Sequence, residues 1–321
     1  MRLAQRQARL TVPVVLLFVV AAVTAAATGS GRWTWLHLLF AGGVVLLISA
    51  VSLMLTITWS AAPAPRDWLV VLQRTCITVG AATVVAGRDL ATPAWIVVAG
   101  AVLYLAGLAG LGYLLVATVR GGVERRFDVA VAGYVVALVA GMAAVVIGAV
   151  MASASPSVNL RATHATLNLL GLVGIVIGAT LPFYVATVGR SKMAPLARPA
   201  WLATWLLYQT FALALAAAGF VSSTDVVGAV GLALYAAGLC ALVPALPRPT
   251  RRQLRWAGPR LIGIWAGLAW WVVATAASAV DAARGDPALA DRWLLVLVLA
   301  AYGQIVWGSV AYLLPVLRGG G

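Results

Sequence analysis

The stretch LLFAGGVVLLISAVSLMLTITW, residues 38–59, contains no charged side chain. About 20 consecutive apolar residues are enough for an α-helix to cross a hydrocarbon core of ~30 Å. A chain in lipid must satisfy its own backbone hydrogen bonds, and a helix does so within itself. The stretch therefore predicts a membrane-spanning helix, and comparable stretches recur along the whole chain.

Composition agrees with this pattern, because the chain is 63% hydrophobic and 9% charged, with a mean hydropathy of +1.03. The apolar–polar alternation typical of a membrane β-barrel is absent. We predict an all-α polytopic bundle in the lipid bilayer, a single integral membrane domain over residues 1–321. The ten predicted spans are Thr11–Thr28, Trp33–Thr58, Asp67–Ala86, Pro93–Val119, Phe127–Ala152, Arg161–Val188, Pro199–Val221, Val226–Leu246, Pro259–Val280 and Arg292–Leu317.

The net charge of +14 raises the question of nucleic acid binding, but the distribution of the charge indicates a membrane topology instead. Of the 22 Lys and Arg, five fall in outer loops, Arg74 falls within a span, and the remaining sixteen fall in inner loops and ends. An excess of basic residues marks the cytoplasmic side. We therefore expect both termini in the cytoplasm, a multi-pass protein of the plasma membrane, and no nucleic acid partner.

All loops are short, so we expect any chemistry to occur within the membrane or at its surface. The segment PRPTRRQLRWAG, residues 247–258, is rich in proline and arginine and is a candidate internal seam. The chain closes with Gly319–Gly321, and a glycine run is typical of a flexible connector. The chain is thus a candidate membrane part of a longer fusion protein.

Two histidines occur in the whole chain, His37 and His164, each near the start of a span that runs from outside to inside. At ~1.5 Å per residue, both lie at nearly the same depth below the outer surface. Ionisable side chains inside a membrane are candidates for function. If the second and sixth spans are neighbours, the two imidazoles suit the axial positions of a haem b iron. Copper is the alternative metal, although two histidines alone are an incomplete site for it.

The surroundings of the histidines extend this prediction. Gly171 and Gly174 lie seven and ten residues after the second histidine, which on an α-helix predicts a groove for a flat ligand. Arg32 and Arg161 lie just outside the two histidines and suit haem propionates, because guanidinium groups pair with carboxylates. The competing interpretation is structural: the histidines hydrogen-bond to neighbours, the glycines pack helices, and the arginines mark helix ends. The spacing alone leaves both interpretations open.

Three stretches carry a resemblance to a known family. They are HLLFAGGVVLLISAVSLMLTITWSAAPAP at 37–65, HATLNLLGLVGIVIGATLPFY at 164–184 and GQIVWGSVAYLLPVLRGGG at 303–321. They resemble segments of actinobacterial membrane proteins related to NnrS and haem–copper oxidase subunit I. The resemblance implies His37 and His164 as haem ligands. Relatives often have a second histidine where this chain has Thr166, so the chain departs from the pattern of a catalytic binuclear centre.

The resemblance also implies a role and partners. Such proteins are often fused or adjacent to copper nitrite reductase or multicopper oxidase domains. We expect an electron-transfer protein of the respiratory type, a non-catalytic subunit or domain of an oxidoreductase system. It would pass electrons between quinone and an outer-face cupredoxin, copper nitrite reductase or cytochrome. The alternatives are a membrane protein without a redox cofactor, which handles copper, responds to nitric oxide or serves assembly, and a transporter.

Overall fold

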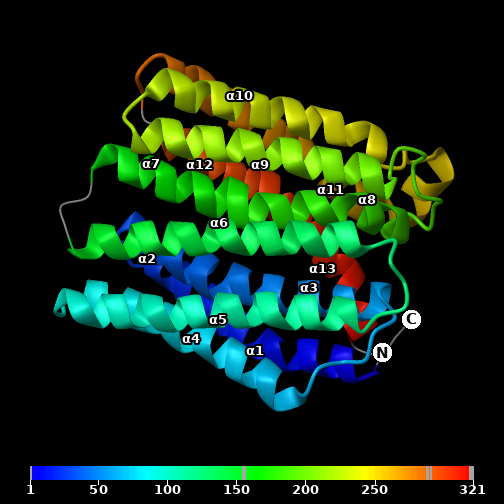
Figure 1. Ribbon diagram of the computed structural model, residues 1–321, viewed down its shortest axis with the longest axis horizontal. Coiled ribbons are helices and arrows are strands. Elements are labelled where there is room, and N and C mark those ends of the chain that lie inside the picture. Colours follow the sequence, from blue (N-terminus) through cyan, green and yellow to red (C-terminus); the bar gives the residue numbers. More distant parts are fainter. Residues whose placement is uncertain (1, 154–156, 287–288, 290, 318–321) are drawn as a thin grey trace. The chain divides into compact units, whose positions relative to one another are not determined.

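The computed structural model describes residues 2–153, 157–286, 289 and 291–317. Ten helices in this part of the chain are long and apolar enough to cross a membrane. Their ribbons run the length of the view in Figure 1, and no strand occurs among the described residues. The predicted all-α polytopic bundle is thereby confirmed, and the chain is a multi-pass membrane protein.

The chain divides into two compact units, Met1–Pro156 and Ser157–Gly321, with five spans in each. The boundary follows the fifth span, whereas the candidate seam at 247–258 lies inside unit 2. There, Thr250 starts a helix through a capping box: its hydroxyl accepts from Gln253 N at 3.3 Å, and its own N donates to Gln253 Oε1 at 2.8 Å. The ninth span therefore begins eight residues before the predicted Pro259.

Unit 1 has seven helical elements. They are α1 (Arg2–Ala27), α2 (Arg32–His37), the π-helix η1 (Leu38–Val44), α3 (Val45–Trp59), α4 (Asp67–Asp89), α5 (Ala94–Arg120) and α6 (Asp128–Ser153). Helices α4 and α5 pack backbone to backbone, because a Cβ on Gly80 would lie 2.6 Å from Tyr104 N. At one end of this unit, the amides of Val123 and Glu124 both donate to Ser60 O, at 2.9 and 3.1 Å, which ties two loops together.

Arg74 of α4 is the charged residue that the sequence places deep within a span. Its guanidinium donates to Gln7 O and, at 2.6 Å, to the hydroxyl of Thr11, both in α1. The side chain thus points towards the start of α1, as snorkelling would direct it, and ends on a neighbouring helix. Arg74 therefore holds α1 to α4 within unit 1.

Unit 2 has ten helical elements in its described part. They are α7 (Val158–Thr166), the π-helix η2 (Leu167–Gly174), α8 (Ile175–Val188), α9 (Pro199–Val221), α10 (Asp225–Leu242), the 3-10 helix η3 (Val243–Ala245), α11 (Arg251–Ala283), α12 (Asp291–Leu295), the π-helix η4 (Val296–Gly303) and α13 (Gln304–Leu317). The end of α11 is tied to the next span, because Arg292 donates to both Asp281 oxygens, at 2.9 and 3.0 Å, and Trp293 Nε1 donates at 2.7 Å.

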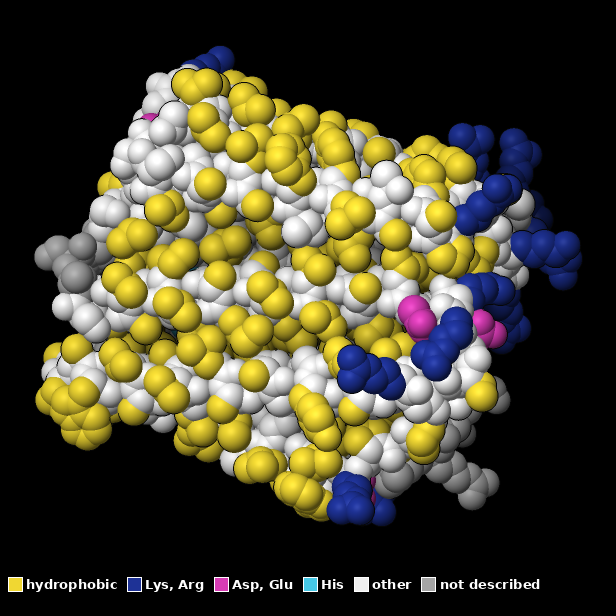
Figure 2. Space-filling view, viewed as in Figure 1, with side chains coloured by type: hydrophobic (Ala, Val, Ile, Leu, Met, Phe, Trp, Pro, Cys, Tyr) yellow, Lys and Arg dark blue, Asp and Glu magenta, His cyan; other side chains and the backbone are white. Residues whose placement is uncertain are grey.

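The surface of the helices is apolar along their length. Figure 2 shows hydrophobic side chains spread over the helices, with Lys and Arg side chains gathered near helix ends. Large apolar residues such as Leu17, Tyr113 and Leu207 are each more than half exposed. An exposed apolar surface of this kind is the one that hydrocarbon tails contact in a membrane.

Candidate histidine sites

His37 is the last residue of α2 and directly precedes the π-helix η1. Its Nδ1 lies 2.7 Å from Trp33 O, one helical turn back, and its ring stacks on the Trp33 indole with centroids 4.0 Å apart. A carbonyl oxygen only accepts, so Nδ1 carries the proton and Nε2 carries the lone pair. A backbone carbonyl on the far nitrogen is the usual way in which a protein fixes the tautomer of a metal-binding histidine.

The first turn of α2 is held by the end of α4. The Arg88 guanidinium lies over the Trp33 ring, 4.1 Å from its centroid, and Thr34 donates to Asp89 Oδ1 at 2.9 Å. The Arg88–Trp33–His37 series therefore fixes the imidazole plane from outside α2. The sequence did not reveal Arg88 in this role, because it lies 51 residues after His37. The predicted partner Arg32 is exposed at the start of the same short helix.

His164 lies in α7, three residues before the π-helix η2. The Asn168 amide donates to His164 O at 3.0 Å and lies 3.2 Å from His164 Nε2. Since the amide nitrogen is a donor, Nε2 accepts and carries the lone pair, as in His37. Arg161 is exposed one turn earlier. His37 belongs to unit 1 and His164 to unit 2, and the structure defines each unit by itself, so their pairing stays a prediction.

The two histidines share a feature that the sequence did not predict: each precedes a π-helical segment. A π-helix closes i→i+5 hydrogen bonds, is rare, and occurs often at functional sites. Buried tyrosines donate to three backbone carbonyls of these segments. Tyr104 donates to Ala41 O of η1 at 3.0 Å, whereas Tyr235 and Tyr302 donate to Leu170 O and Leu169 O of η2 at 2.6 and 2.7 Å.

These tyrosines were missed, although the sequence holds a signal for them. All three lie in the middle of predicted spans, away from the interfaces where tyrosine is usual. A buried tyrosine hydroxyl generally has a hydrogen-bond partner. Their position therefore indicates polar groups at mid-membrane, and only the structure identifies those groups as π-helix carbonyls.

The groove expected below His164 is filled in the structure. A Cβ on Gly174 would lie 2.7 Å from the Tyr235 hydroxyl and 2.8 Å from Trp271 Cζ2, and a Cβ on Gly178 would lie 2.5 Å from Trp205. Aromatic rings of unit 2 thus occupy the space that we assigned to a flat ligand. These rings come from α9, α10 and α11, which the spacing of residues within one helix does not reveal. Gly171 is buried within η2.

The described residues contain no group of three or more His, Cys, Asp or Glu side chains arranged to hold a metal ion. Cys76 and Cys240 are both free thiols in the membrane spans. A metal that requires three or more ligands of these four types therefore has no such cluster in the described part of the chain. Two histidines suit a metal whose remaining ligands come from a macrocycle.

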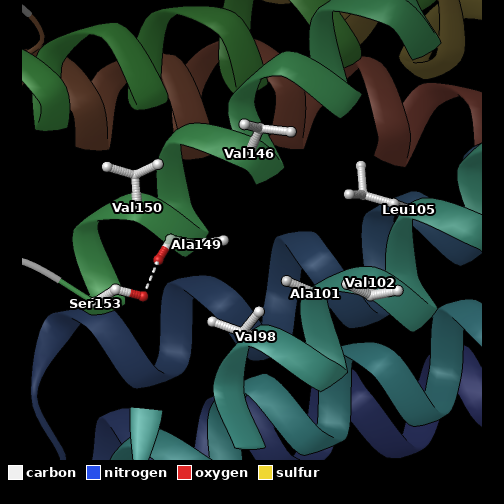
Figure 3. A pocket seen from close by; sticks show the side chains of 8 residues that line it. All are labelled: Val98, Ala101, Val102, Leu105, Val146, Ala149, Val150 and Ser153. Carbon is white, nitrogen blue, oxygen red and sulfur yellow. Dashed lines mark hydrogen bonds between the residues drawn. The ribbon is translucent and has the colours of Figure 1, made fainter. Parts of the chain in front are cut away.

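An apolar groove of about 350 Å³ lies in unit 1 between α5 and α6. Side chains from Val98 to Leu105 of α5 and from Val146 to Ser153 of α6 line it (Figure 3). The Ser153 hydroxyl donates to Ala149 O at 3.1 Å, so it serves the helix end. The lining offers apolar contact and no metal ligand, and the groove has no part in the histidine sites.

No model of a protein family matches the chain, and no curated protein matches it in sequence. The two histidine sites and the ten spans are therefore the features that bear on function.

Proposed function

We propose that this chain is an integral membrane electron-transfer protein of the respiratory type that holds one b-type haem, which His37 and His164 would bind through Nε2. One observation supports the proposal: in each unit, the hydrogen bond of a histidine that precedes a π-helix places the ring proton on Nδ1, so that Nε2 is the nitrogen that would bind iron. A bound haem supplies one-electron redox chemistry. The resemblance to proteins related to NnrS supports the same assignment.

In this proposal the chain's own groups orient the ligand nitrogens. The Trp33 carbonyl and ring fix the His37 imidazole, and Arg88 fixes Trp33. At His164, Nε2 accepts from the Asn168 amide, so this amide would have to release Nε2 for His164 to hold the haem. Arg32 and Arg161 are exposed near the two histidines and pair with the propionates. Gly174 has no role in the proposal, because aromatic side chains already fill its face.

We further propose that both termini are cytoplasmic, that the haem lies near the outer face of the plasma membrane, and that it carries electrons between quinone and an outer-face copper or haem protein. The excess of basic residues at one set of helix ends supports this orientation. The copper-handling alternative has weaker support, since the described residues lack a cluster of three metal ligands. No observation favours the transporter alternative.

A reduced-minus-oxidised visible spectrum and a pyridine haemochrome assay of the purified protein test the proposal. We expect about one b-type haem per chain, and its loss in His37→Ala and His164→Ala. Thr166→Val is the matched control, because it changes a buried side chain of the same helix that has no ligand role, and it retains the haem. His37→Met keeps a ligand, so it retains haem with a raised reduction potential. The absence of haem from wild-type protein made with ample haem overturns the proposal.

A further inference from the structure

Helix α11 is much longer than a membrane crossing requires. Its 33 residues extend about 50 Å, whereas about 20 residues cross a core of ~30 Å. The bonds of Asp281 to Arg292 and Trp293 hold its last turn to the start of the next span. The surplus therefore lies at the other end, over the first ten residues. These contain Arg251, Arg252, Arg255 and Arg260.

Trp256 lies in the middle of this basic first segment of α11. The guanidinium carbons of Arg190 and Arg260 lie 4.3 and 5.0 Å from the Trp256 ring centroid. The indole is still 42% exposed, and Leu254 beside it is 37% exposed. Tryptophan with arginine and an exposed leucine is typical of the boundary between headgroups and acyl chains.

Arg190 occupies an unfavourable backbone conformation to reach this position. It has φ +47°, in the left-handed region, at the residue where helix α8 ends in a Schellman motif. Ser191 N donates to Ala186 O at 2.9 Å and Arg190 N donates to Thr187 O at 3.2 Å, which defines that motif. Glycine is the usual residue at such a site. An arginine at this position costs some stability, and its side chain lies over the Trp256 ring.

The basic residues at this end of unit 2 have no acidic residue of their own unit to neutralise them. The sequence has no Asp or Glu between Asp128 and Asp225, nor between Asp225 and Asp281. The acidic residues of unit 2 all fall at the opposite helix ends or in the loop that joins them. Unit 1 differs, because Arg6 lies 3.5 Å from Asp67 and Arg125 lies 3.7 Å from Asp128.

We propose that this surface, the α11 basic collar, binds the headgroup of an anionic phospholipid. It consists of Arg190, Arg251, Arg252, Arg255, Trp256 and Arg260. Arginine forks bind phosphate oxygens, and basic residues next to a span attract anionic lipids. A lipid also covers the exposed Trp256 and Leu254 with its acyl chains. Free phosphate and nucleic acid offer no apolar contact to these two residues.

Native mass spectrometry of the full chain in detergent tests this site. The protein is titrated with dioleoyl phosphatidylglycerol or with dioleoyl phosphatidylcholine, and retained lipids are counted. We expect preferential retention of phosphatidylglycerol, and retention weaker by at least about tenfold in the triple variant Arg251→Gln, Arg252→Gln, Arg255→Gln. The control triple variant Arg120→Gln, Arg125→Gln, Arg126→Gln removes the same charge from unit 1 and retains the lipid.

Three results overturn the proposal: equal retention of the two lipids, equal loss in both triple variants, or displacement of the lipid by inorganic phosphate alone. Arg190→Gly gives a second readout that does not depend on a damaged fold. Glycine relieves the left-handed strain, so the variant unfolds in phosphatidylcholine at a temperature no lower than wild type. Phosphatidylglycerol nevertheless raises the unfolding temperature of this variant less than that of wild type. An equal rise in both proteins contradicts a role for Arg190.

Discussion

A single carbonyl oxygen determines the chemistry available to His37. Because Trp33 O accepts from Nδ1, the lone pair of the neutral imidazole lies on Nε2. His164 has the same tautomer, because Asn168 donates to Nε2 and the proton of the neutral ring is then on Nδ1. In both histidines Nε2 therefore carries the lone pair. In His37, a backbone carbonyl accepts from Nδ1.

Gly174 gives a test of the filled face at the residue scale. Gly174→Ala places a methyl group against the Tyr235 hydroxyl and the Trp271 ring, both of which are fully buried. We expect a loss of about 1–3 kcal/mol in unfolding free energy, as for other overpacked sites. Thermal or denaturant unfolding of the detergent-solubilised protein measures it.

Gly112→Ala is the control for this change, because its Cβ would have one neighbour, Leu138 Cδ1 at 3.7 Å. That contact is ordinary van der Waals packing, so we expect stability close to wild type. If Gly174→Ala were as stable as Gly112→Ala, the face below His164 would be open, as α-helical spacing first predicted.

At the scale of elements, the π-helices are the features that distinguish the histidine spans. A π-helix leaves carbonyls without their regular partner, and in hydrocarbon an unpaired carbonyl is costly. Tyr104 meets this need in unit 1, and Tyr235 and Tyr302 meet it in unit 2. The third π-helix, η4, contains Tyr302 itself. In unit 2, one π-helix therefore supplies the donor that another requires.

Tyr235→Phe tests this coupling. The change removes the donor to Leu170 O and leaves the ring packing intact, so a buried carbonyl loses this hydrogen bond. We expect a loss of about 1–3 kcal/mol in unfolding free energy, together with faster amide hydrogen exchange over η2.

Tyr113→Phe is the matched control. It removes the same hydroxyl group from a side chain that is 65% exposed at the helix surface. We expect no measurable effect on stability or exchange. Equal effects of the two variants would show that the Tyr235 hydroxyl contributes nothing to η2.

At the scale of the whole molecule, the chain has two units of five spans, and each unit contains one histidine. The proposed function assigns both histidines to one haem. The topology behind this proposal depends on basic residues that mark one set of helix ends as cytoplasmic.

Cysteine labelling tests the topology. In a background with Cys76→Ser and Cys240→Ala, Lys192→Cys lies in the loop between α8 and α9, and Asp286→Cys lies in the loop after α11. We expect a membrane-impermeant maleimide to label Asp286→Cys on intact cells and Lys192→Cys only in inverted vesicles. Each variant is the control for the other, and labelling of both from one side contradicts ten spans with cytoplasmic termini.

Sequence by itself determined the class of protein and the approximate position of every span. Length and apolarity suffice for this, because hydrocarbon forces each segment to satisfy its backbone as a helix. Even so, α11 begins at Arg251, whereas hydropathy predicted a loop up to Pro259. The capping box of Thr250 and Gln253 favours a helix in this polar segment. The positions of the two histidines also followed directly from the sequence.

Tertiary structure alone decided what surrounds the histidines. The π-helices, the tyrosines that satisfy them, the Arg88–Trp33–His37 series and the filled face at Gly174 all depend on contacts between helices distant in sequence. Periodicity assumes regular α-helical turns, and one wide turn changes which residues share a face. A π-helix in lipid is stabilised where neighbouring helices donate hydrogen bonds to its carbonyls. These donors lie far away in the sequence, so no local sequence pattern encodes the contacts.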